Sequence, residues 1–97
     1  MPGFVQIMEI KTSRIEELEA LVKKMQEEQG DSLLSTRAVL TADRDRPGYY
    51  VNIIEFNSYE EAMKNSNDPA ITKMANDMGN LLDGPPKFYN LDVRQEM

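Results

Sequence analysis

The sequence predicts an α+β fold whose elements follow the order β-α-β-β-α-β, and three observations support this prediction. Four segments are rich in β-branched and aromatic residues, as strands are. Two regions between them repeat apolar residues at the spacing of an amphipathic helix. The two middle β-rich segments are joined by residues 44–48, "RDRPG", and a short loop with Pro and Gly is typical of a hairpin.

The first strand is expected at residues 3–12 and the first helix directly after it. Side chains alternate between the two faces of a strand. One face then carries Phe4, Gln6, Met8 and Ile10, and the other carries Val5, Ile7, Glu9 and Lys11. Ser13 and Glu16 have the spacing of a capping box at the start of the helix. Gly30 is expected to end that helix in the left-handed conformation.

Strands are predicted next at residues 33–43 and 49–57, paired so that partner numbers sum to 92. A slip of one residue would exchange the two faces. On one face this register pairs Arg37 with Glu55, Val39 with Ile53 and Thr41 with Val51. On the other it sets Thr36, Ala38, Leu40 and Ala42 against Phe56, Ile54, Asn52 and Tyr50.

The second helical region is expected to begin at a capping box of Ser58 and Glu61 and to break at Asp68-Pro69. Asp68 then caps a further helix whose first residue is Pro69. "DGPP" at 83–86 ends that helix, and residues 87–95 form the last strand. This is the ferredoxin-like arrangement, with the helices on one face of a four-stranded antiparallel sheet. We expect residues 1–97 to form one domain.

Apolar residues occupy both faces of the predicted strands, which is unusual for a sheet with one wet face. The first strand places Val5 and Ile7 opposite Phe4 and Met8. A second copy of the chain is the simplest cover for the second face, since two-fold dimers are the commonest oligomers. We therefore expect a homodimer formed through the sheet faces.

Composition narrows the classes of partner and location. The 97 residues carry a formal net charge of −6 and contain no cysteine, so disulfides and thiolate sites are excluded. The few basic residues are scattered, which argues against nucleic acid and anionic membranes as partners. The N-terminal segment lacks a signal peptide's basic region and cleavage site. We expect a cytoplasmic protein.

The order of elements and the segment "PGYYVNIIEFNSYEEAMKNSNDPAI" resemble the antibiotic biosynthesis monooxygenase domain family. The likeness includes a strand ending in Glu55-Phe56, the Ser58 cap, the Glu61-Ala62 pair and the break at Pro69. It implies a dimeric α/β barrel in which each chain has a cavity between its sheet and its helices. Members include cofactor-independent monooxygenases acting on phenolic polycyclic substrates, haem-degrading enzymes and isomerases of signal molecules.

The chain departs from the haem-degrading branch of this family. That branch uses a pocket tryptophan and an iron-binding histidine, whose positions fall near Asn65 and Ala75. The sequence contains no tryptophan and no histidine, so haem degradation by that mechanism is not expected. We expect no cofactor and no metal site. Without histidine, a general base must be a carboxylate, a tyrosine or a lysine with a shifted pKa.

Each candidate site residue has a functional and a purely structural interpretation. Arg37 and Glu55 form either an anion anchor with a base or a cross-strand ion pair. The amides of Asn52 and Asn65 bind either a substrate oxygen or backbone and water. The catalytic candidates are therefore Asn52, Asn65, Arg37 and Glu55. The substrate-binding candidates, whose alternative role is packing, are Gln6, Tyr50, Met63, Met74, Met78 and Tyr89.

Three functions are compatible with these residues. In a cofactor-free oxygenase, a substrate deprotonated to an enolate or phenolate would pass an electron to dioxygen inside a dry cavity. A non-catalytic dimer would bind a hydrophobic aromatic or polyketide-type molecule, or would assist another enzyme of a pathway. An isomerase or cyclase would use the same pocket.

Overall fold

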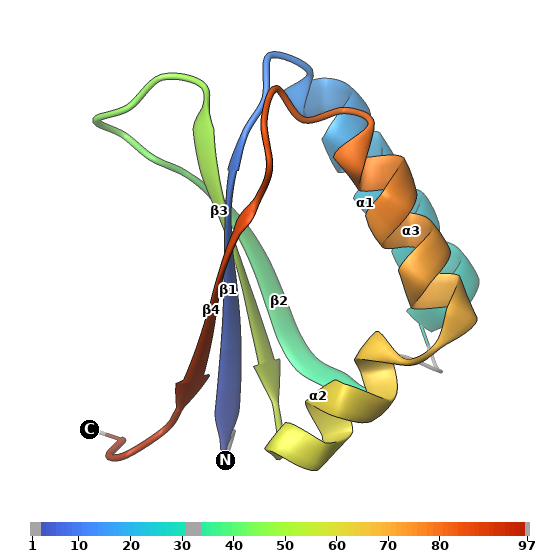
Figure 1. Ribbon diagram of the computed structural model, residues 1–97, viewed down its shortest axis with the longest axis vertical. Helices are drawn as coiled ribbons and strands as arrows, with labels where there is room; N and C mark the ends of the chain where they lie inside the picture. The colour runs from blue at the N-terminus through green and yellow to red at the C-terminus, as the bar shows by residue number, and fades with distance from the viewer. Residues whose placement is uncertain (1–2, 31–33, 97) are drawn as a thin grey trace.

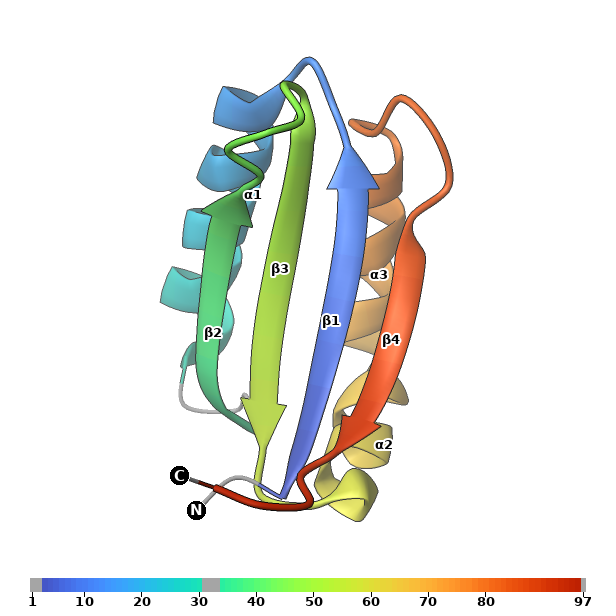
Figure 2. The same ribbon diagram turned by 90° about the vertical axis from the view of Figure 1, so that its left-hand side faces the viewer.

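The computed structural model describes residues 3–30 and 34–96 and has the predicted ferredoxin-like order of elements. A four-stranded antiparallel sheet in the order β2-β3-β1-β4 is covered on one face by helices (Figures 1 and 2). α2 lies near one end of the sheet, at an angle to α1 and α3 (Figure 1). The elements are β1 Phe4–Lys11, α1 Ile15–Gln29, β2 Ser35–Ala42, β3 Tyr49–Phe56, α2 Tyr59–Ser66, α3 Pro69–Gly79 and β4 Lys87–Asp92.

The hairpin of β2 and β3 has the predicted register over most of its length. Arg37 pairs with Glu55, and Val39 pairs with Ile53. The prediction was wrong at the open end, where Ser35 rather than Thr36 lies opposite Phe56 because the register shifts between Ser35 and Arg37. The Thr36 hydroxyl donates to the carbonyl of Glu55 at 3.2 Å beside this irregularity. Residue 33, where this strand was expected to begin, lies outside the described residues.

Two of the predicted helix caps are confirmed. The Ser58 hydroxyl accepts a hydrogen bond from the Glu61 N–H at 3.2 Å, and α2 follows. The Asp68 carboxylate accepts from the Ala70 N–H at 2.9 Å, and Pro69 is the first residue of α3. The break at Asp68-Pro69 therefore starts a new helix in a new direction.

The predicted capping box at Ser13 is wrong. Arg14 occupies the cap position of α1 and makes no side-chain capping hydrogen bond. The hydroxyl of buried Thr12 binds the backbone at the start of α1 instead. It accepts a hydrogen bond from the Arg14 N–H at 2.9 Å and donates one to the Leu81 carbonyl at 2.6 Å. Ser13 faces Asp83 instead, at 3.5 Å. Because the Thr12 hydroxyl also binds Leu81, which follows α3, it is Thr12 and not Ser13 that binds the backbone at the start of α1.

Two further local predictions at element ends were wrong. Gly30 has φ −46° and continues the right-handed conformation, so it does not end α1 in the left-handed one. The last strand, predicted at residues 87–95, ends at Asp92. Its pairing with β1 runs from Lys87 opposite Glu9 to Asp92 opposite Phe4, where β1 itself begins.

Arg46 fastens the β2–β3 hairpin loop to the neighbouring strand β1. Its guanidinium pairs with Glu9 of β1 and with Asp43 of the loop, the latter at 2.8 Å. The same group lies 4.4 Å from the centre of the Tyr49 ring. Gly48, with φ +86°, supplies the left-handed residue that returns the chain to β3.

The buried core is divided into two clusters at opposite ends of the sheet. Phe4 and Phe56 pack with Ala62 of α2 at one end. Ile10 packs with Leu18 of α1 and Met78 of α3 at the other. Between Phe4 and Ile10, the side chains of β1 that face the helices are partly buried. This division leaves room over the middle of the sheet.

The sheet face away from the helices carries an apolar patch around Val5 and Ile7, bordered by charged residues such as Glu55 of β3. Val5 and Ile7 of β1 lie between partners on both neighbouring strands. Those partners include Ile53 on β3 and Tyr89 and Leu91 on β4, of which the last two are 37% and 44% exposed. Figure 2 looks onto this face, with the helices behind it. Among the described residues, no helix is long and apolar enough to cross a membrane.

Candidate functional site

A cavity of about 500 Å³ lies between the sheet and the helices, over the middle of the strands. All four strands and all three helices contribute to its walls. Its main side chains are Gln6, Met8, Val22, Met25, Arg37, Ala38, Asn52, Ile54, Asn65, Ile71, Met74, Ala75, Met78, Leu82 and Phe88. The cavity crosses the sheet from the edge strand β2 to the edge strand β4.

The strand sequences explain why this space is not filled by the core. On the side of β1 that faces the helices, Gln6 and Met8 lie between buried Phe4 and buried Ile10. On β3, the polar residue Asn52 occupies the corresponding middle position, opposite Met8. Because polar or flexible side chains occupy the middle of β1 and β3, the two core clusters do not meet over the centre of the sheet.

The amides predicted from the sequence line the same cavity. Asn52 lines it from β3, and Asn65 lines it from the last turn of α2. Gln6 also lines it and donates to the side-chain oxygen of Asn90 on β4 at 3.2 Å. Within residues 3–30 and 34–96, no protein partner is seen for the Asn52 amide, although it is only partly exposed. No group in the described part of the chain therefore competes with a ligand oxygen for this amide.

Arg37 and Glu55 are direct cross-strand neighbours of β2 and β3. Arg37 is exposed on the edge strand and borders the cavity where it opens along β2. Glu55 pairs with Arg37 in the register but does not line the cavity. No ion pair joins their charged groups in the described part of the chain. Arg37 is thus an exposed residue at the cavity edge whose charge is not paired with Glu55 among the described residues.

Arg37 is the one titratable side chain among the described residues that line the cavity. Arginine stays protonated in proteins and cannot accept a proton. The described walls contain no carboxylate, tyrosine or lysine, the three groups from which a general base was expected. The cavity offers hydrogen-bond donors and a positive charge to an anion, and no side chain of its described walls can act as a base.

Three further predicted residues lie away from the cavity. Tyr50 packs against the core cluster of Ile10 and Leu18. Met63 is 42% exposed on α2. Tyr89 lies on the apolar outer face of the sheet, paired with Ile7. By contrast, the predicted methionines Met74 and Met78 do line the cavity.

Phe88 borders the cavity and was missed by the sequence analysis. It is 53% exposed on β4 and pairs with Met8 of β1. The residues of a strand alternate in direction, so Phe88 and Tyr89 necessarily serve opposite faces. The register between the first and last strands was the missing information, because it alone shows which of the two aromatic rings faces the helices.

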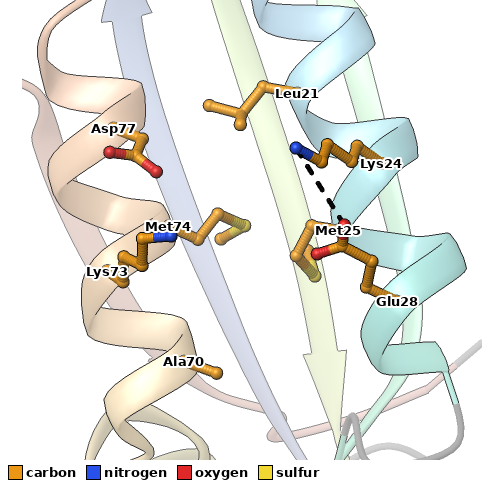
Figure 3. Close-up of a pocket in the computed structure, with 8 residues that line it drawn as sticks. All are labelled: Leu21, Lys24, Met25, Glu28, Ala70, Lys73, Met74 and Asp77. Atoms are coloured by element: carbon orange, nitrogen blue, oxygen red, sulfur yellow. Dashed lines mark ion pairs between the residues drawn. The ribbon is translucent and has the colours of Figure 1, made fainter.

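A second, smaller hollow of about 150 Å³ lies on the outer side of the helix layer, between α1 and α3 (Figure 3). Met25 and Met74 line both this hollow and the central cavity, so their side chains form the partition between the two. Charged residues surround the outer hollow, including Lys24, which lies 4.0 Å from Glu28. The central cavity is larger and more sheltered, and we take it as the candidate site.

The groups with displaced pKa values lie outside the central cavity. Hydrogen bonds from the Arg46 side chain and the Asp45 N–H lower the pKa of Asp43, and the same ion pair with Asp43 raises the pKa of Arg46. These shifts belong to the loop anchor on β1. The described residues contain no cluster of three or more His, Cys, Asp or Glu placed to hold a metal ion.

No protein-family model and no curated protein sequence matches this chain. Its structure, in contrast, is similar to solved structures over nearly its whole length. SnoaB, a cofactor-independent oxygenase from Streptomyces nogalater, matches with a TM-score of 0.82 at 15% identity, covering 100% of this chain and 98% of that chain. A crystal structure of an antibiotic biosynthesis monooxygenase matches with a TM-score of 0.75 at 15% identity, covering 95% and 99%.

A conserved protein from Methanosarcina mazei matches equally well, with a TM-score of 0.83 at 10% identity and coverage of 97% and 95%. Sequence identities this low carry information about the fold alone. The chain therefore has the fold of the antibiotic biosynthesis monooxygenase structures, as the sequence resemblance implied. What it does with that fold depends on its own side chains.

Proposed function

We propose that the central cavity binds a hydrophobic aromatic or polyketide-type molecule and that the protein oxidises this molecule with dioxygen, without a cofactor. The observation that carries the proposal is the wall chemistry: apolar and thioether side chains surround amide donors and one guanidinium. Such a cavity accepts a flat apolar molecule and orients it by a single oxygen. The name of SnoaB, a cofactor-independent oxygenase of the same fold, supports the choice of reaction.

In the proposed reaction the bound molecule reacts as an enolate or phenolate. Amide N–H groups of Asn52 and Asn65 donate to its oxygen, and Arg37 lies at the cavity edge with its positive charge. These groups stabilise the anion in a site of low dielectric constant. The anion passes one electron to dioxygen, and the resulting radicals combine into a peroxide. Loss of water then converts the reacting CH₂ group to a carbonyl, so one O₂ gives one C=O and one H₂O.

A second candidate function, binding without chemistry, is favoured by one specific observation. The described cavity walls hold no side chain that accepts a proton. An oxygenase built this way depends on a substrate that ionises readily, whereas a binding protein has no such requirement.

Oxygen consumption distinguishes the two functions. Purified protein is mixed with 1,8-dihydroxyanthrone or 1-naphthol, with a chelator and without flavin, and oxygen uptake is compared with binding measured by calorimetry. Uptake above the protein-free rate, with one O₂ consumed per carbonyl formed, supports the oxygenase. Tight binding with no added uptake supports the binding protein. Absence of both contradicts the proposed function.

We also propose that two copies of the chain associate through the apolar outer face of the sheet. Val5, Ile7 and Ile53 lie in the middle of this face, where a single chain buries them only in part. Covering them with a second copy removes apolar surface from water at about 25 cal/mol per Å². The cavity lies on the other side of the sheet, so each copy keeps its own cavity.

A further inference from the structure

Phe88 is exposed in a way that the fold does not require. Its side chain is 53% exposed and belongs to neither of the two core clusters. All six residues of β4 are exposed, and edge strands usually carry charged residues at such positions. A large apolar ring that borders a cavity and stays half in water gains most from a ligand that covers it.

Phe88 also ends a row of side chains that crosses the sheet on the cavity side. Asn52 of β3 pairs with Met8 of β1, and Met8 pairs with Phe88 of β4. The order of the strands in Figure 2 makes these three residues consecutive across the sheet. Neighbouring strands lie about 4.8 Å apart, so the backbones of Asn52 and Phe88 are about 10 Å apart.

We infer that Phe88 is a specificity-determining residue that selects ligands with three or more linearly fused rings. The inference rests on the proposed function, in which an aromatic molecule occupies the cavity. The oxygen of its terminal ring lies at Asn52, and its long axis runs along the row toward Phe88. A two-ring molecule held there ends over Met8. A third ring in the same plane reaches Phe88 and stacks on its face or edge.

The chemistry of the row suits this arrangement. The polar group is at one end, the Met8 thioether is in the middle and the aromatic ring is at the other end. A thioether makes favourable contacts with ring edges, and aromatic rings prefer offset or edge-to-face contacts. The cavity reaches the exposed ring of Phe88 on the edge strand β4, so the far ring is not enclosed there by the core.

The first test compares two probes on one variant. Calorimetry measures the binding of 2-hydroxyanthracene, with three linearly fused rings, and of 2-naphthol, with two, to the wild-type chain and to Phe88→Leu. In both probes the hydroxyl is on a terminal ring, so the other rings extend away from it. Phe88→Leu should raise the Kd of the three-ring probe roughly five- to tenfold, because the contact between the rings is lost. It should change the Kd of the two-ring probe little. Equal effects on both probes, or none on either, overturn the inference while leaving the proposed function intact.

Tyr59 provides a matched control, because it is an aromatic residue with the same 53% exposure and does not line the cavity. The chain contains no tryptophan, so Phe88→Trp and Tyr59→Trp each introduce a single fluorescent reporter. The three-ring probe should protect the tryptophan at 88 from iodide quenching and leave the one at 59 accessible. Failure to protect position 88 at a saturating concentration also overturns the inference. If the wild-type chain binds neither probe, the proposed function itself has failed.

Discussion

Asn52 of β3 and Asn65 of α2 line one cavity from its two opposite layers, the sheet and the helices. Two amide donors on opposite walls can bind the same oxygen of a flat ligand. We expect Asn52→Ala and Asn65→Ala each to weaken anion binding or lower kcat about ten- to a hundredfold, since a hydrogen bond to a charged group contributes about 1.5–3 kcal/mol. Asn57→Ala, in the exposed turn after β3, is the matched control. Equal losses in all three variants would contradict a specific role.

The pH dependence of the reaction should follow the ligand. Because Arg37 is the one titratable group on the described walls of the cavity, no protein group there changes charge near neutral pH. The rate of oxygen uptake is expected to rise with pH through the pKa of the bound ligand. Two ligands with different pKa values should give displaced profiles. Identical profiles for both would point to a protein base outside the cavity walls.

The outer face of the sheet gives a prediction about assembly. The wild-type chain of 11.1 kDa is expected to sediment as a dimer at micromolar concentration. Ile53→Glu places a charge in the middle of the apolar face and should shift the chain toward monomer, because burying an unpaired carboxylate is costly. Lys23→Glu, on the exposed surface of α1, is the control and should remain dimeric. A wild-type chain that sediments only as a monomer refutes the dimer.

The loop anchor predicts a titration that NMR can follow. Hydrogen bonds from the Arg46 side chain and the Asp45 N–H hold the pKa of Asp43 below its ordinary value. Arg46→Gln should raise that pKa toward the ordinary value. A lowered folded-state pKa stabilises the fold above the unfolded-state pKa, and this contribution disappears as pH falls through the folded-state value. The stability difference between wild type and Arg46→Gln should therefore shrink on acidification, as seen by denaturation at each pH.

Helix starts give a stability prediction that separates true caps from apparent ones. Ser58→Ala and Asp68→Ala should each lower the free energy of unfolding by about 1 kcal/mol, since each removes a capping hydrogen bond. Thr12→Val should cost about 1–3 kcal/mol, because it leaves the Leu81 carbonyl and the Arg14 N–H without their partner. Ser13→Ala should change stability by less than about 0.5 kcal/mol. Urea denaturation measures all four variants, and a large effect at Ser13 would contradict the structure.

The sequence predicted local structure correctly where the contacts that determine it join residues close together in the chain. Ser58 caps the helix that begins beside it, and Asp68 does the same for Pro69. The loop with Gly48 holds the hairpin in the register predicted from its symmetry. In each case the interacting groups are a few residues apart, so no distant part of the chain competes for them.

Two of the failures occur where a distant segment intervenes. Ser13 has the spacing of a cap, yet Thr12 takes the position because its hydroxyl also reaches Leu81, far along the chain. The sequence gives no sign of this contact. At the candidate site, the alternation of side chains in β3 was enough to predict Asn52. On β4, the register with β1 was needed to show that Phe88 and not Tyr89 faces the cavity.

The sequence alone determined the order of the strands and helices, the two faces of each strand, the break at Asp68-Pro69 and the amide at Asn52. It could do so because side-chain period, turn residues and caps act over short spans of the chain. Tertiary structure alone decided which side chains enclose the cavity and that no general base is among those described. It also decided that the core divides into two clusters with the cavity between them. These features arise when strands far apart in the chain are set side by side, and their register is a property of the whole sheet.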